Sequence, residues 1–414
     1  MKKILIKNSN IYGNVKIDGS KNSALPIICA SLLTDKKTTL YNIPNIIDVN
    51  NLITISNKVG ANIKRKGNKL IIKPRLEKTD LLDPMCKTFR ASYYLMGVYL
   101  ALFKHATIYL PGGCSIGKRP IDYHLLGFEK LGADYEIIDD YIDIKIINPK
   151  PANIVLPKQS LGAAINIALV ASKINGTTTI QNISKEPEMI DFINFMNIMG
   201  NDLKIDGTTL YINGSYKDLN NKNNYQIIPD RIEAATYLAL GLITDSVKIK
   251  YKGTLYLDNF LTPLINNGAI FKRDKQSITA CKSTIQGFSI TSGNYPLLST
   301  DIFPLLLPIF AYSKGTSTLI ETIYEDRFKV CEELQKIGVN IIIEKNKCTI
   351  SDIKLNYKLN VVKAHDLRCA ASLLIYSIAK KEDIIIENID IIERGYSNIY
   401  NKLKKIGLVY EFIN

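Results

Sequence analysis

Residues 38–72 read TTLYNIPNIIDVNNLITISNKVGANIKRKGNKLII, and this stretch holds one copy of the pattern that decides the fold. It opens with a Thr-rich strand, continues as an amphipathic helix, closes on Gly60 and ends in two short alternating strands around Lys66-Gly67-Asn68. A glycine in the closing position can end a helix in the left-handed conformation that residues with a β-carbon resist. Two alternating strands joined by a short Gly-containing turn predict a β-hairpin.

The same pattern occurs six times along the chain. The closing glycines recur about every 70 residues, at Gly60, Gly132, Gly200, Gly268, Gly338 and Gly407. The strands that open the copies begin near Thr38, Ala106, Thr178, Val247, Thr316 and Asp383. Spacing this regular indicates repetition of one supersecondary unit.

Between successive copies lies a second kind of helix, which is nearly apolar on all sides. The six stretches are residues 24–33, 91–103, 163–171, 234–243, 302–311 and 370–378. A helix that is apolar all round is buried. Each unit therefore reads β-α-β-α-β-β, with one helix inside and one on the surface. We predict an α/β protein of two domains, each built from three units around its inner helices.

The predicted inner helices begin with polar residues. Four starts carry a residue type that commonly caps a helix, namely Ser160, Asp230, Thr300 and Asp366. Capping does not explain the cations that accompany the starts, which are Lys21, Arg90, Arg231 and Arg368. Because helix N-termini carry unpaired amides and a partial positive charge, starts that converge would form an anion site.

Length and composition set the class of protein. At 414 residues the chain suits two domains of about 200 residues each. With 46% hydrophobic and 22% charged residues, it is neither disordered nor fibrous. The net charge of +14 is compatible with nucleic acid, a membrane surface or small anions, and equally with lysines scattered over solvated faces.

Cysteine usage and the N-terminus indicate the compartment. The seven cysteines are widely spread and form no C-x-x-C pair, so we expect neither a disulfide framework nor a Cys-ligated metal. The apolar stretch within residues 1–10 is too short for a signal peptide. No apolar run reaches the roughly 18 residues of a membrane span. We expect a cytoplasmic protein without metal or cofactor.

The loop from Pro111 to Pro120 places Cys114 between glycines and close to Lys118 and Arg119. Nearby cations lower the pKa of a thiol and make it reactive. A mobile loop of this kind can act as a lid that carries a reactive group to bound substrate. The alternative is an exposed cysteine without a role.

Residues 112–124, GGCSIGKRPIDYH, resemble the reactive loop of the enolpyruvyl transferases, in the branch that uses UDP-N-acetylglucosamine, where the pattern is G-G-C-x-I-G-x-R-P-x-D-x-H. Similar stretches follow the family order: Gly19–Pro26, Arg90–Ser92, Pro229–Glu233, Thr300–Asp301, Glu325–Phe328, Asp366–Arg368 and Arg394–Tyr396. The resemblance covers essentially the whole chain. It implies an inside-out α/β barrel of two three-unit domains, which we place at residues 21–229 and at 1–20 with 230–414.

The resemblance also implies a reaction. The enolpyruvyl group of phosphoenolpyruvate passes to the 3-hydroxyl of UDP-N-acetylglucosamine through a tetrahedral intermediate that eliminates phosphate. Cys114 matches the proton donor of the family. Asp301 matches the residue that contacts the sugar hydroxyl and is a candidate base. The residues that match the phosphoenolpyruvate cluster are Lys21, Asn22, Arg119 and Arg394.

For the nucleotide sugar, the resemblance implies a longer set of binding residues. They are Arg90, Arg119, Pro120, Ile121, Asp122, Tyr123, Lys158, Gln159, Ser160, Leu161, Asp301, Ile323 and Arg327. Asp122 is an equally good candidate for the N-cap of the helix that follows. His124 is a candidate for orienting the loop, whereas His105 and His365 are expected to be structural.

Two departures from the family pattern affect the expected site. After Pro44 the family often has a lysine, yet this chain reads Asn45-Ile46-Ile47-Asp48, so one cation is missing. Phe303-Pro304 replaces a more polar run, with a proline that a first helical turn accepts.

Two other functions compete with this one. The first is the sister transfer to shikimate 3-phosphate, against which the Cys114 loop argues. The second is a basic nucleic-acid-binding or RNA-end-processing protein, which would need a basic stripe with interleaved aromatics. We expect phosphoenolpyruvate and UDP-N-acetylglucosamine as partners, with no nucleic acid or membrane, and favour a monomer.

Overall fold

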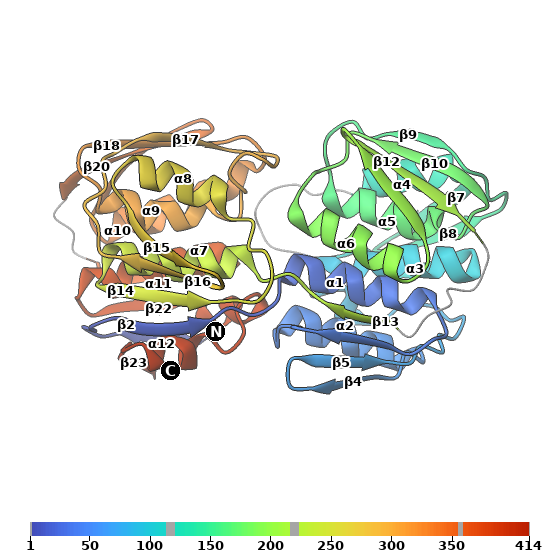
Figure 1. The fold of residues 1–414 in the computed structure, drawn as a ribbon, viewed down its shortest axis with the longest axis horizontal. Helices are drawn as coiled ribbons and strands as arrows, with labels where there is room; N and C mark the ends of the chain where they lie inside the picture. The colour runs from blue at the N-terminus through green and yellow to red at the C-terminus, as the bar shows by residue number, and fades with distance from the viewer. Residues whose placement is uncertain (1, 113–120, 216–222, 355–358, 414) are drawn as a thin grey trace. The chain divides into compact units, whose positions relative to one another are not determined.

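The computed structural model describes residues 2–112, 121–215, 223–354 and 359–413, and the chain divides into two compact units (Figure 1). Within these ranges, unit 1 contains residues 2–18 and 229–413, and unit 2 contains residues 19–112 and 121–228. The chain passes from one unit to the other between residues 18 and 19 and again between 228 and 229. Both units mix helices with sheets, so the predicted α/β class is confirmed.

The described strands form three sheets in each unit. In hydrogen-bonded order, the sheets of unit 2 are β13 (Asn223–Gln226), β3 (Thr38–Tyr41), β5 (Lys69–Ile72), β4 (Ile63–Lys66); β6 (His105–Tyr109), β8 (Tyr141–Ile146), β7 (Ala133–Ile138); and β11 (Asp202–Asp206), β12 (Thr209–Gly214), β10 (Gly176–Gln181), β9 (Asn153–Val155). Those of unit 1 are β15 (Ile270–Asp274), β16 (Ser277–Cys281), β14 (Ser246–Lys250), β2 (Tyr12–Lys16); β17 (Ser289–Ser292), β18 (Thr316–Glu321), β20 (Lys347–Lys354), β19 (Val339–Glu344); and β21 (Val361–Lys363), β22 (Ile384–Glu387), β1 (Lys3–Ile6), β23 (Tyr410–Ile413).

The four-stranded sheets share one construction, and in the three-stranded sheet an isolated parallel bridge between Leu81 and Ile108 takes the place of the first strand. A strand before the inner helix pairs in parallel with the strand after it, as β9 pairs with β10 and β17 with β18. The next two strands then add in antiparallel fashion, as β12 joins β10 and β11 joins β12. A parallel pair needs a crossover, and the inner helix supplies it. The predicted β-α-β-α-β-β unit is therefore confirmed.

At the chain crossings, the strands that neighbour each other in sequence belong to different sheets. Strand β2 directly precedes the first helix of unit 2, yet it pairs in parallel with β14 of unit 1. Strand β13 precedes the first helix of unit 1, yet it pairs in parallel with β3 of unit 2. Each of these strands therefore pairs within its own unit with a strand that is distant in sequence, rather than with the strand that follows the next helix.

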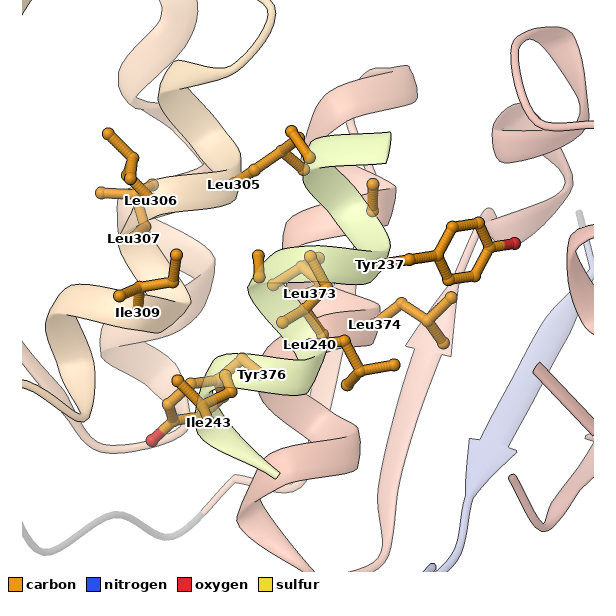
Figure 2. Close-up of a cluster of buried hydrophobic side chains, with 14 of the residues drawn as sticks. Tyr237, Leu240, Ile243, Leu305, Leu306, Leu307, Ile309, Leu373, Leu374 and Tyr376 are labelled. Atoms are coloured by element: carbon orange, nitrogen blue, oxygen red, sulfur yellow. The ribbon is translucent and has the colours of Figure 1, made fainter. Parts of the chain in front are cut away.

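The inner helices are buried almost all round, as their composition predicts. They are α1 (Lys21–Ala30), α3 (Tyr93–Phe103) and α5 (Leu161–Ala171) in unit 2, and α7 (Arg231–Ile243), α9 (Phe303–Ala311) and α11 (Leu367–Lys380) in unit 1. Figure 2 shows the core of unit 1, where Leu305 of α9, Leu240 of α7 and Leu373 of α11 extend between the three helices. No helix in the described ranges is long and apolar enough to cross a membrane.

The outer helices are less completely buried than the inner ones, except for α6 (Pro187–Ile198), which buries most of its residues. They are α2 (Ile47–Lys58), α4 (Asp122–Lys130), α6, α8 (Asp258–Asn266), α10 (Lys329–Lys336) and α12 (Ile399–Lys405). Each ends shortly before one of the six predicted glycines, and all six glycines have positive φ, between 92° and 107°. A Cβ on Gly60 would also lie 2.1 Å from the carbonyl oxygen of Arg75. Both backbone angle and space therefore require glycine there.

A largely buried ion cluster fixes Asp18, the residue that ends the first segment of unit 1 (residues 2–18). The Lys402 ammonium donates to a carboxylate oxygen of Asp18 at 2.7 Å and to one of Glu233 at 2.6 Å. The other Glu233 oxygen accepts from the Asp18 amide at 2.9 Å. Burial lowers the pKa of Lys402, but the two carboxylates outweigh it, so the pKa lies above its ordinary value. One cation of α12 thus joins α7 to the residue that ends the segment.

Replacing Lys402 by methionine leaves two carboxylates close together in a buried place without a cation. We expect Lys402→Met to lower the free energy of unfolding by about 3–5 kcal/mol, the usual cost of removing one partner of a buried ion pair. Lys404→Met, on the exposed face of the same helix, should change it by less than about 0.5 kcal/mol. Urea unfolding of the two variants measures the difference, and equal midpoints would contradict this account of the cluster.

Candidate active site

In unit 1 the expected residue Asp301 lies just before α9, and two buried arginines hold its carboxylate. Nη2 of Arg327 donates to one oxygen at 2.5 Å, and Nη2 of Arg368 donates to the other at 3.1 Å. The two arginine side chains are only 2% and 3% exposed, whereas that of Asp301 is 25% exposed. The two arginines therefore fix the carboxylate of Asp301, and part of it stays exposed to solvent.

Thr300 does not cap α9, which corrects one sequence expectation. Its hydroxyl donates to the Glu321 carboxylate at 2.7 Å and accepts from Nε of Arg327 at 3.2 Å. Glu321 is itself buried and also accepts the hydroxyl of Ser292 at 2.9 Å and the backbone amide of Ile323 at 2.7 Å. The acid at the end of β18 thereby positions Thr300, Arg327 and the expected residue Ile323 together.

The start of α11 completes this group. Asp366 caps the helix, as the sequence predicts, by accepting the amides of Arg368 and Cys369 at 2.7 and 3.0 Å. Nη1 of Arg327 lies 3.8 Å from the same carboxylate. A Cβ on Gly395 would come within 2.5 Å of Leu367, so the chain that carries Arg394 passes tightly over the first turn of α11. The structure thus brings Asp301, Arg327, Arg368 and Arg394 to one end of the inner helices of unit 1.

Arg368 is almost completely enclosed, like Arg327. Its guanidinium lies 5.4 Å from the centre of the Tyr396 ring. Burial lowers the pKa of Arg368, but the negative charge of Asp301 together with Tyr396 and Asp230 outweighs it, so the pKa lies above its ordinary value. Among the described residues, Nε and Nη1 of Arg368 find no hydrogen-bond acceptor although they are buried. Charged N–H groups left in this state favour an anionic ligand.

In unit 2 the expected residue Lys21 is the first residue of α1. Its ammonium lies 3.4 Å from the carboxylate of Asp48, and the two side chains are 15% and 6% exposed. Asp48 stands in the stretch where a family lysine is missing, so this end of α2 offers an anion in contact with Lys21. Asn51, one turn further along α2, donates to the hydroxyl of Thr88 at 3.3 Å, which ties α2 to the segment leading into Arg90.

A second group of expected residues gathers around the ring of Tyr93. The Arg90 guanidinium lies 5.6 Å from the ring centre, and the His124 imidazole lies 4.6 Å from it. A Cβ on Gly162 would come within 2.4 Å of the Tyr93 hydroxyl, so the first turn of α5 touches the same side chain. One tyrosine therefore joins Arg90, the helix that follows the Cys114 loop and the start of α5.

The stretch from Lys158 to Leu161 leads into α5. Ser160 caps the helix as predicted, since its hydroxyl accepts the amide of Ala163 at 3.2 Å. Lys158 is exposed, and Gln159 and Leu161 are half-buried. The remaining amides of the first turn point along the helix axis, where they suit an anion.

The expected residues after the loop begin the outer helix α4. Ile121 occupies the cap position, and Asp122 is the first helical residue, exposed and without a capping hydrogen bond. The alternative in which Asp122 caps this helix is therefore wrong. Tyr123 is half-buried. Cys114, Arg119 and Pro120 lie outside the described residues.

Several residues that matter to this geometry were not predicted as site residues. They are Asp48, Glu321, Asn166, Asp366 and Arg368. The last two stood in a recognised motif, which was the available signal. The others are single polar residues in apolar surroundings, and nothing in their local sequence identifies their partners.

The other histidines contact acids away from these groups. Nε2 of His105 lies 2.6 Å from Asp143, and Nε2 of His365 lies 2.8 Å from Glu333. Among the described residues, no cluster of three or more His, Cys, Asp or Glu side chains is arranged to hold a metal ion.

Known proteins resemble this chain over nearly its whole length. Residues 5–403 match the family described as EPSP synthase (3-phosphoshikimate 1-carboxyvinyltransferase). A protein of Halothermothrix orenii named UDP-N-acetylglucosamine 1-carboxyvinyltransferase is 36% identical over 98% of each chain. One of the same name from Clostridium botulinum is 37% identical over 98% of this chain and 99% of the relative.

Solved structures agree on the fold. The enolpyruvyl transferase NikO from Streptomyces tendae superposes with a TM-score of 0.92 at 20% identity, covering 100% of this chain and 99% of that one. EPSP synthase from Acinetobacter baumannii gives 0.80 at 16% identity, with both chains fully covered. The predicted two-domain enolpyruvyl transferase fold is confirmed, and this chain belongs to the EPSP synthase family.

Proposed function

We propose that this chain transfers the enolpyruvyl group of phosphoenolpyruvate to the 3-hydroxyl of UDP-N-acetylglucosamine and releases phosphate. The observation that carries the proposal is the identity of 36–37%, over nearly the full length, to relatives named for that reaction. The G-G-C-x-I-G-x-R-P-x-D-x-H loop agrees with it. Both substrates are anions, and the candidate site supplies cations at helix starts.

The reaction sets clear chemical requirements. The sugar hydroxyl oxygen bonds to C2 of phosphoenolpyruvate while the C3 methylene accepts a proton. The tetrahedral adduct then expels phosphate and loses a proton from C3, which restores the double bond. The site must therefore supply an acid near C3, an acceptor for the hydroxyl proton, and cations for the carboxylate and phosphate.

Cys114 is the proposed acid at C3. This assignment rests on its place in the loop motif and on the neighbouring Lys118 and Arg119, which favour a reactive thiol. Lys21, Asn22, Arg119 and Arg394 are the proposed partners of phosphoenolpyruvate. Asp48 keeps the Lys21 ammonium near the start of α1.

Asp301 is the proposed partner of the sugar hydroxyl. Each of its oxygens accepts a hydrogen bond from a buried arginine, and the side chain is 25% exposed, so a substrate hydroxyl can reach the carboxylate. Such a carboxylate can accept the hydroxyl proton without moving. Nε and Nη1 of Arg368, which are buried without an acceptor in the part of the chain that the structure describes, support binding of an anionic group beside it.

The proposed nucleotide-sugar residues come from several elements. They are Arg90, Arg119, Pro120, Ile121, Asp122, Tyr123, Lys158, Gln159, Ser160, Leu161, Asp301, Ile323 and Arg327. Arg90 and the first turn of α5, which meet at Tyr93, are the proposed contacts of the diphosphate.

The proposed reaction is the first committed step of peptidoglycan precursor synthesis. It belongs in the cytoplasm and uses no metal, cofactor, nucleic acid or membrane. We propose a monomer. The competing function is transfer to shikimate 3-phosphate, which the description of the matched family favours.

Phosphate release distinguishes the two functions. We expect phosphate only when the protein receives both phosphoenolpyruvate and UDP-N-acetylglucosamine, and none with either substrate alone. Shikimate 3-phosphate in place of the nucleotide sugar should give no release. Release with shikimate 3-phosphate, and none with the nucleotide sugar, would reverse the assignment.

Cys114→Ser tests the proton donor. A hydroxyl is a much weaker acid than a thiol, so kcat should fall by about 10²–10⁴-fold. Binding of UDP-N-acetylglucosamine, measured by calorimetry, should stay within about twofold. Cys281→Ser, at a partly exposed thiol on β16, is the matched control and should keep full activity. Normal turnover of Cys114→Ser would remove the thiol from the mechanism.

Asp301→Asn tests the carboxylate with almost no change in shape. Because the amide cannot take the hydroxyl proton, kcat should fall at least about 100-fold. The two buried arginines also lose their counter-ion, so stability should drop by roughly 1–3 kcal/mol. Asp326→Asn is the control, since that carboxylate is 48% exposed and lies 3.7 Å from Lys329. Equal kcat for the two variants would exclude Asp301 from the reaction.

A further inference from the structure

A buried side-chain amide lies beneath the histidine that follows the Cys114 loop. Asn166, in the middle of the inner helix α5, has no exposed surface, and His124, in the first turn of α4, is 3% exposed. Nδ2 of Asn166 lies 3.0 Å from Nδ1 of His124 and 2.9 Å from the backbone oxygen of Tyr93. Three elements that carry expected site residues thus meet at one amide.

The contact with Tyr93 fixes which way the amide faces. A backbone carbonyl only accepts hydrogen bonds, so the Asn166 atom beside it must be the NH₂ group. With the amide reversed, two oxygens would face each other at hydrogen-bond distance. The Asn166 oxygen instead lies toward Gly97, where a Cβ would come within 2.0 Å of it. The absence of a side chain at Gly97 therefore makes room for this orientation.

The amide orientation in turn fixes the tautomer of the imidazole. The second hydrogen of the Asn166 NH₂ group is directed to Nδ1 of His124, so Nδ1 must accept. A neutral imidazole then carries its hydrogen on Nε2. Burial, together with the positive charge of Arg90, lowers the pKa of His124 to about 3. The ring consequently stays neutral at physiological pH and cannot serve as a general acid there.

A neutral donor in this position suits one part of the proposed substrate. His124 and Arg90 lie against the same Tyr93 ring, and the first turn of α5 reaches that ring as well. A cation, a fixed N–H group and helix amides together match the oxygens of a diphosphate. A second cation in place of neutral His124 would be repelled by Arg90.

We propose that Asn166 is a positioning residue, which locks His124 as the Nε2–H tautomer so that this N–H donates to the diphosphate of the nucleotide sugar. The inference rests on the proposed function and adds a residue that acts only through another. The Tyr93 carbonyl fixes the orientation of the Asn166 amide, and the Asn166 amide fixes the tautomer of the His124 ring.

The test reverses the polarity of the amide without changing its shape. In Asn166→Asp an acceptor replaces the donor, so Nδ1 of His124 should acquire the hydrogen. The chain contains only three histidines, so ¹⁵N labelling of histidine resolves their ring nitrogens. The unchanged protein should show Nε2–H for His124 with no change between about pH 5.5 and 8.5, since a group with a pKa near 3 does not titrate there. The variant should show a neutral ring with the hydrogen on Nδ1, so that Nε2 no longer donates.

Binding and kinetics provide the second readout. Loss of a hydrogen bond to a charged group should weaken binding of UDP-N-acetylglucosamine by about 10- to 100-fold in calorimetry and raise its KM similarly. The KM for phosphoenolpyruvate should stay within about twofold. Asn197→Asp is the matched control, because its amide donates to the Leu203 carbonyl at 2.9 Å, outside all the proposed site residues. That control should leave both the His124 spectrum and nucleotide-sugar binding unchanged.

A double-mutant cycle separates positioning from simple packing. In a His124→Gln background, which replaces the imidazole by an amide, Asn166→Asp should weaken nucleotide-sugar binding far less than it does beside His124. Equal losses in both backgrounds would overturn the proposal, as would an altered tautomer without loss of binding. If Asn166→Asp does not fold, Asn166→Ser repeats the cycle by removing the amide.

The outcomes also distinguish this proposal from the proposed function. An unchanged protein that binds UDP-N-acetylglucosamine but releases no phosphate would contradict the reaction while leaving the tautomer result in force. An unchanged protein that shows Nδ1–H for His124 would overturn the positioning role even with full activity.

Discussion

The inner helices have no polar face that could be exposed to solvent, and the rest of the structure depends on that constraint. A helix apolar on all sides must be covered by its neighbours, and in unit 1 α7, α9 and α11 cover one another (Figure 2). The aspartates and arginines of the candidate site then lie at the helix ends. Asp301 and Asp366 lie at two of these ends, and Arg327 contacts both carboxylates. The chemistry therefore gathers where burial of the helices stops.

The two units stabilise the cations near their inner helices in different ways. Unit 1 encloses Arg327 and Arg368 almost completely and neutralises them with aspartates. Such buried pairs add little net stability, because desolvation offsets their attraction, but they fix geometry. Unit 2 leaves its cations nearer to solvent, with Lys21 beside Asp48 and Arg90 against Tyr93.

Asn166 shows how packing and chemistry depend on the same atoms. A polar group inside the core is costly unless it is hydrogen-bonded. The Asn166 NH₂ group is satisfied by Tyr93 and His124 together, whereas its buried oxygen has no hydrogen-bond partner among the described residues. Its oxygen fits only because Gly97 lacks a side chain. Core packing thus sets the direction of a hydrogen bond at the edge of the site.

The sequence alone determined the six units, their closing glycines, the buried helices and the cations at the helix starts. These features are local, because hydrophobic period and backbone angle depend on residues a few positions apart. It did not reveal the partners of the site residues. Lys21 and Asp48 are 27 positions apart, Thr300 and Glu321 are 21 apart, and His124 and Asn166 are 42 apart. It also did not show that β2 pairs in parallel with β14 or that β13 pairs in parallel with β3. Only the tertiary structure decided these points, since strand pairing and buried hydrogen bonds are chosen by which segments pack together, and no local pattern encodes that choice.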